Sequence, residues 1–156
     1  MIISISGTPG TGKTTLARKL AKTAGYKYLN VGRLIKSKNI AESYDRKRRC
    51  YVVDIKKLNK VLIEKIRKFP DIIIDSHLSH YLPKEYVNLC IITKCSLKAL
   101  EGRLKKKRYS KQKIRENLDC EIFDVCLNEA KEAGHKVIVV DTTKGFKIKE
   151  LVKKIK

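Results

Sequence analysis

No apolar run in this 156-residue sequence approaches the ~20 residues that a transmembrane helix needs. The opening segment MIISISG also lacks the basic stretch and the small-residue cleavage site of a secretory signal. We therefore expect a soluble, cytoplasmic protein with no membrane partner.

The cysteines lack the spacing of a metal site or a disulfide framework. Their number is odd, and no CxxC pair or Cys/His cluster that would suit zinc occurs. In a reducing compartment we expect reduced thiols, most of them buried. The five residues are Cys50, Cys90, Cys95, Cys120 and Cys126.

Acidic residues are scarce relative to basic ones. The chain has 16 Asp and Glu against 37 Lys and Arg, a formal net charge of +21. This balance favours polyanionic partners such as a nucleotide, RNA or a ribonucleoprotein. The alternative is a Lys- and Ile-rich proteome, such as that of a thermophile.

The sequence contains no internal repeat, low-complexity segment or Pro/Gly-rich linker. These absences predict one domain over residues 1–156. A chain of this length buries roughly two-thirds of its unfolded surface, so its core needs neither disulfides nor a metal.

Short apolar runs alternate with helical patterns along the chain. Runs at residues 2–6, 28–31, 72–75, 89–93 and 137–140 predict buried strands. Apolar periodicity predicts helices over 13–24, 54–69, 96–107 and 110–133, the last with Leu118, Ile122 and Val125 facing the core. The alternation predicts an α/β fold with a parallel sheet covered on both faces.

The segment GTPGTGKT, residues 7–14, matches the phosphate-loop pattern G-x-x-x-x-G-K-[ST] between a predicted strand and a predicted helix. Glycine allows the backbone to turn its N–H groups inward around phosphate oxygens. Lys13 would reach the β- and γ-phosphates of ATP, and the Thr14 hydroxyl would bind Mg²⁺. The alternative is a glycine-rich turn without chemistry.

The apolar run IIID, residues 72–75, ends on a carboxylate. In a parallel sheet the loops after the strands form the ligand crevice, so Asp75 would lie beside the phosphate loop. There it would bind a water on Mg²⁺ or contact Thr14, as a Walker-B-type aspartate does. An ordinary helix cap or turn residue is the alternative.

His77 follows Asp75 by two positions. An imidazole titrates near neutral pH, so this ring could face a γ-phosphate or an attacking water. A surface histidine without a function is the alternative.

Several separated stretches together resemble the adenylate kinase isoenzyme 6 family, in its archaeal-type form. They are GTPGTGKTTLARKLA, YLNVGRL, SYD with Cys50 and Asp54 after it, IIIDSH, RL with KKKRY behind it, and NLDCEIFDV. The resemblance extends from residue 2 to about residue 140. It implies a P-loop nucleotide kinase fold with five parallel strands flanked by helices, an NMP-binding segment at about 30–53 and a short lid at about 106–116.

The resemblance also implies roles for individual residues. The ATP phosphates would be bound by Gly10, Gly12, Lys13, Thr14 and Thr15, together with Lys107 and Arg108. The acceptor nucleotide would be bound by Asn30, Gly32, Arg33 and Lys36. Lid candidates are Arg103, Lys107 and Arg108; Mg²⁺ would be held by Thr14 and, through water, by Asp75. The catalytic set would be Lys13, Asp75 and His77.

Two regions depart from the family pattern. The family commonly has an acidic residue and then an Arg for the acceptor phosphate where this sequence has Arg33 and Lys36. Lysine cannot form arginine's two-pronged bond, so acceptor binding should be weaker or altered. In the lid, such kinases usually present an Arg to the transferring phosphoryl group, and the aligned residue here is Lys107, with Arg108 beside it. The alternative for the segment RLKKKR is a solvated helix end, where cations are also favoured.

The resemblance implies two activities: Mg²⁺-dependent phosphate transfer from ATP to AMP, and ATP hydrolysis that assists maturation of the small ribosomal subunit. The partners would be ATP, AMP, a small-subunit ribosomal protein and ribosomal RNA. An ATPase-type assembly factor with little kinase activity, or a P-loop small-molecule kinase with another acceptor, are the alternatives. The sequence leaves the oligomeric state open.

Overall fold

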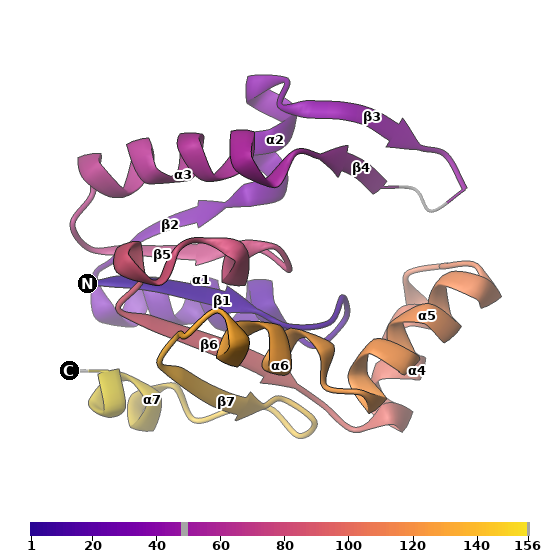
Figure 1. Ribbon diagram of the computed structural model, residues 1–156. Helices are drawn as coiled ribbons and strands as arrows, with labels where there is room; N and C mark the ends of the chain where they lie inside the picture. The colour runs from indigo at the N-terminus through magenta and orange to yellow at the C-terminus, as the bar shows by residue number, and fades with distance from the viewer. Residues whose placement is uncertain (48–49, 156) are drawn as a thin grey trace.

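The computed structural model describes residues 1–47 and 50–155 and contains a central five-stranded parallel sheet (Figure 1). The strand order is β2-β5-β1-β6-β7, and every neighbouring pair is parallel. The strands are β1 (Ile2–Ser6), β2 (Lys27–Asn30), β5 (Ile72–Asp75), β6 (Leu89–Lys94) and β7 (Val137–Asp141). The predicted α/β fold class is confirmed.

Alternate residues of each strand point to opposite faces of the sheet, and helices bury both faces. On one face Ile73 packs with Leu16 of α1 (Lys13–Ala24) and Leu151 of α7 (Ile148–Ile155). On the other, Ile72 packs with Leu58 of α3 (Ile55–Lys68), and Cys90 and Ile92 pack with Ala130 of α6 (Val125–Glu132). Burial of one such aliphatic side chain contributes roughly 1.5–3 kcal/mol, so these two layers hold the sheet together.

The segment from 30 to 53 stands apart from this sandwich. It consists of α2 (Val31–Lys38) and an antiparallel hairpin of β3 (Ala41–Asp45) and β4 (Cys50–Val53). Figure 1 shows the hairpin overhanging the same end of the sheet that α4 (Leu97–Lys106) and α5 (Lys111–Ile122) approach from the other side. Two short 3₁₀ turns, η1 (Ser79–Tyr81) and η2 (Lys84–Tyr86), lie between β5 and β6.

Three local predictions were wrong. Val31 begins α2 rather than ending the second strand, because the Asn30 side chain caps that helix by accepting a hydrogen bond from Arg33 N at 2.9 Å. The helix predicted over 110–133 is two helices, since Asp124 adopts a left-handed φ of 53° that a right-handed helix cannot continue through. The third error concerns the core face of this helix, to which Ile122 was assigned. Ile122 is 53% exposed, and the neighbouring Glu121 is buried instead.

The cysteines are free thiols, as expected, but only Cys90 and Cys95 are buried; the others are half-buried. Burial raises the pKa of the Cys90 thiol to about 11. Within the described residues, no helix has both the length and the apolar character to cross a bilayer.

Candidate active site

The phosphate loop is pressed between β6 and α4 so closely that glycine is required. Gly7 has a φ of 138°, and a Cβ there would lie 2.5 Å from the Thr93 carbonyl oxygen. Gly10 has a φ of 96°, and its Cβ would lie 2.9 Å from Leu100 Cδ1. Side chains at these positions would both strain the backbone and push the loop away from its supports.

Threonine hydroxyls hold the loop in shape. Thr11 Oγ1 donates to the Thr8 carbonyl at 2.7 Å and also bonds Thr93 Oγ1 at 2.7 Å. Thr142, in the loop after β7, donates to the Thr11 carbonyl at 2.6 Å. Arg103 of α4 donates to the Thr142 carbonyl at 2.7 Å. The phosphate loop is therefore tied to β6, to the loop after β7 and to α4.

Lys13 extends back across the loop that precedes it. Its Nζ donates to the carbonyls of Gly7 at 2.8 Å and Thr8 at 2.9 Å. Burial removes water from the ammonium and lowers the pKa of Lys13 to about 8. A phosphate oxygen in the loop would favour the charged form and satisfy this cation.

Asp75 is buried, 3% exposed, at the carboxyl end of β5. Its Oδ2 accepts hydrogen bonds from Thr14 Oγ1 at 2.8 Å, Tyr28 OH at 2.8 Å and Asn30 Nδ2 at 3.0 Å. The parallel register that pairs Asn30 with Asp75 brings these groups together. Among the described residues no donor reaches Oδ1, so this oxygen is available to a further ligand.

The donor set beside the loop fits Mg²⁺. The Thr14 hydroxyl and Asp75 Oδ1 are hard oxygen donors of the kind that this ion prefers. The described part of the chain contains no group of three or more His, Cys, Asp or Glu side chains that could hold a metal by themselves. Such an ion would therefore depend on nucleotide phosphates and water for its other ligands, which is usual for Mg²⁺.

A cavity of about 910 Å³ opens over the phosphate loop. Basic side chains line it, and none of its lining residues in the described part of the chain carries a carboxylate. The cations are Lys13, Lys19, Arg103, Lys106, Lys107 and Lys144. Its volume and charge suit a polyphosphate ligand of nucleotide size.

Comparisons with known proteins identify the family of the chain. A family profile described as "AAA domain" matches residues 3–124. The "Putative adenylate kinase" of Pyrococcus furiosus is 41% identical over 155 residues, covering 99% of this chain and 82% of that protein. The "Adenylate kinase isoenzyme 6 homolog" of Dictyostelium discoideum is 34% identical over 139 residues, covering 89% and 79%. The chain belongs to the adenylate kinase isoenzyme 6 family.

Solved structures support the fold of this family member. Shikimate kinase from Acinetobacter baumannii, in complex with shikimate, superimposes with a TM-score of 0.62, covering 99% of this chain and 89% of the other, at 16% identity. At that identity the likeness concerns the fold alone. The fold and the family membership together make the chain a P-loop nucleotide kinase.

His77 of this kinase lines the phosphate cavity, with its side chain exposed there. Partial loss of hydration beside the cavity wall, and then the nearby charge of Lys13, lower the pKa of His77 below its usual value. The imidazole is therefore neutral at pH 7 and can accept a hydrogen bond from a water molecule or a hydroxyl group.

The three lid candidates of the kinase are not equivalent. Lys107, at the end of α4, lines the phosphate cavity. Arg103 also lines it, but its guanidinium already binds the backbone of the loop after β7. Arg108 has a left-handed φ of 55° and is not among the cavity residues. The region predicted as a lid is a helix-turn-helix formed by the end of α4 and the start of α5.

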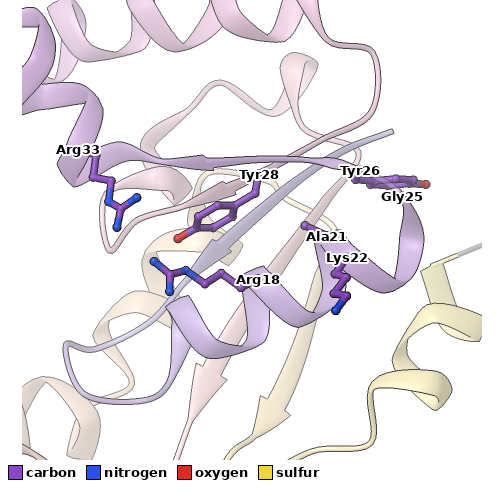
Figure 2. A pocket seen from close by; sticks show the side chains of 7 residues that line it. All are labelled: Arg18, Ala21, Lys22, Gly25, Tyr26, Tyr28 and Arg33. Carbon is purple, nitrogen blue, oxygen red and sulfur yellow. The ribbon is translucent and has the colours of Figure 1, made fainter.

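The four acceptor candidates diverge. Asn30 points to Asp75, and Gly32 and Arg33 are in the first turn of α2, with Arg33 directed toward Arg18 and Tyr28 (Figure 2). Lys36 Nζ instead lies 5.8 Å from the centroid of the Tyr51 ring of the hairpin. These residues do not gather around one point.

Sequence reasoning missed three residues that shape the site. The Tyr28 hydroxyl donates to Asp75. Tyr28 could have been predicted, because it is two positions before Asn30 in β2 and so points to the same face of the sheet. Thr142 and His80 gave no such signal. His80 is 1% exposed; its Nδ1 bonds Ser6 Oγ at 2.7 Å and its Nε2 bonds Glu129 at 2.9 Å, across 74 and 49 positions of sequence.

Proposed function

We propose that this kinase transfers the γ-phosphoryl group of ATP to AMP in a Mg²⁺-dependent reaction in the cytoplasm. The observation that carries the proposal is the cavity over the phosphate loop, which is lined by cations and by no carboxylate and lies next to the paired Thr14 and Asp75. Phosphoryl transfer requires mainly positioning and neutralisation of charge, and this arrangement offers both.

Within this proposal the phosphate loop binds ATP. The backbone N–H groups at Gly10 and Gly12 and the side chain of Thr15 contact phosphate oxygens, and Lys13 leaves its two carbonyl partners for the β- and γ-phosphates. Bound Mg²⁺ supplies neutralisation of the phosphate charge. Thr14 and Asp75 hold it, Asp75 through water.

The lid and the acceptor segment complete the site. Lys107, already in the cavity, approaches the transferring group, with Arg103 and Arg108 as further lid cations that a closing movement brings nearer. The segment of residues 30–53 holds AMP. Movement of α2 and the hairpin would bring Asn30, Gly32, Arg33 and Lys36 together on it, because the side chains of Asn30 and Lys36 point apart in the structure.

A second activity, ATP hydrolysis, is favoured by the position of His77. A neutral imidazole in the phosphate cavity can orient a water toward the γ-phosphate. With a net charge of +21, the protein would act on a ribosomal RNA and a small-subunit ribosomal protein during subunit maturation. Both activities use the same bound ATP.

Product analysis separates these activities. Incubation with Mg²⁺-ATP and AMP should form ADP as the sole product, at a rate that rises with AMP; incubation without AMP should release inorganic phosphate slowly. Lys13→Ala should lose both. A rate that is indifferent to AMP would refute the kinase, and phosphate transfer only to another acceptor such as shikimate would refute both activities.

A further inference from the structure

A second cavity, of about 600 Å³, lies on the α1 face of the sheet at its β2 edge (Figure 2). Small residues, Ala21 and Gly25, leave room there between the end of α1 and the strand. None of its residues lines the cavity over the phosphate loop. The two cavities are therefore separate surfaces.

Three cations surround this β2-edge groove. Arg18 and Lys22 come from exposed positions of α1, and Arg33 comes from α2. In the described part of the chain, no ion pair joins any of the three to a carboxylate, and no acidic residue lines the groove. Like charges held together without counter-charges favour a ligand that brings several negative charges.

Two tyrosine rings add a flat apolar component. Tyr26 and Tyr28 line the groove, and the guanidinium of Arg18 lies 5.8 Å from the centroid of the Tyr28 ring. Tyr28 is engaged with Asp75 through its hydroxyl, whereas Tyr26 has no hydrogen-bond partner among the described residues for its hydroxyl. Tyr26 lies at the end of the groove opposite Arg33 (Figure 2), and a half-buried ring at the end of a row of cations is suited to stacking with a base.

We propose that this groove binds a single-stranded polynucleotide, with phosphates at Arg18 and Lys22 and one base against Tyr26. The groove lies between α1 and β2, which is an edge strand of the described sheet. This groove would be the surface that binds the RNA partner proposed above. Only the choice of RNA as the polynucleotide rests on that proposal. The test of the groove measures binding without ATP, so it can fail while the kinase proposal stands.

The test uses the full chain and fluorescein-labelled oligouridylate 12-mers in anisotropy titrations at several salt concentrations. Arg18→Gln/Lys22→Gln removes two phosphate contacts. For a single strand the salt slope of log K should fall by about 1.4, which corresponds to about 25-fold weaker binding at 0.1 M salt.

A matched control removes the same charge elsewhere. Lys56→Gln/Lys60→Gln alters two exposed lysines of α3, on the opposite face of the sheet, and should change affinity by less than about threefold. Tyr26→Leu should weaken binding about tenfold and leave the salt slope unchanged. Equal losses of affinity in the two double variants, or no binding by the wild type, would overturn the proposal. If the Tyr26 variant folds poorly, the double variants still test the proposal, because their substitutions are at exposed positions.

Discussion

The substitution Asp75→Asn tests the negative charge of this side chain separately from the hydrogen bonds that it accepts. The amide oxygen of Asn can take the place of Oδ2 and still accept from Thr14, Tyr28 and Asn30. The amide nitrogen then takes the place of Oδ1, where it can donate but cannot accept a hydrogen bond from a water on Mg²⁺. The variant should therefore fold but lose catalysis.

The size of the stability loss follows from the three bonds to Oδ2. Hydrogen bonds to a charged acceptor contribute roughly 1.5–3 kcal/mol each and neutral ones roughly 0.5–1.5 kcal/mol. The difference is about 1–1.5 kcal/mol per bond, or about 3–4.5 kcal/mol for three bonds. The net loss is smaller, because Asn also removes the desolvation cost of a charge that is only 3% exposed. Most domains are stable by roughly 5–15 kcal/mol, so the variant should remain folded.

Tyr28→Phe is the matched control for Asp75→Asn. It removes one of the three donors, about 1.5–2 kcal/mol, but keeps the carboxylate and its charge. Urea unfolding measures both stabilities, and ADP formation measures activity at a temperature where both variants are folded. We expect Asp75→Asn to lose about 10²–10³-fold in kcat and Tyr28→Phe less than about tenfold. Equal activity losses in the two variants would refute a role for the charge.

Three further results are expected. ATP affinity should fall about tenfold per pH unit above about pH 8, because the pKa of Lys13 in the free protein is about 8 and phosphate binds the protonated ammonium. Calorimetry of ATP binding above pH 8, in buffers of different ionisation enthalpy, should therefore show proton uptake. The Lys13→Met variant should show none. His77→Ala should lower the rate of phosphate release more than it lowers ATP affinity, because the ring lines the phosphate cavity, where it can orient a water molecule; phosphate-release assays and nucleotide titrations measure the two effects. Gly10→Ala should lower the free energy of unfolding in urea by more than about 1–2 kcal/mol, because Gly10 has a positive φ and packs against Leu100. Gly102→Ala in α4 should instead raise it by up to about 1 kcal/mol, because the space around Gly102 is open. Equal effects of the two substitutions would contradict the packing of the loop.

The parts of the site that are close in sequence were predictable. The phosphate loop is eight consecutive residues, 7–14, between a strand and a helix, and its glycines, Lys13 and Thr14 are local requirements of backbone geometry. Asp75 was placed beside it because an apolar run ending on a carboxylate implies a buried parallel strand that opens onto the ligand crevice. The structure places Thr14 and Asp75 in contact at 2.8 Å.

Contacts between distant segments were not predictable in the same way. Hydrophobic periodicity indicates which residues face the core, but it does not say which strand lies beside which; the β2-β5 register brings Tyr28 and Asn30 to Asp75. Nor did it reveal the break at Asp124, where the chain leaves α5 and starts α6 and Lys94 pairs with the aspartate.

The sequence by itself determined the class of the fold and the phosphate loop, because both follow from local patterns of apolar, β-branched and glycine residues. Only the tertiary structure decided the hydrogen-bond partners of Asp75, the position of His77 in the phosphate cavity and the cations of the β2-edge groove. These depend on burial and on distances between segments tens of residues apart, which chain packing alone sets.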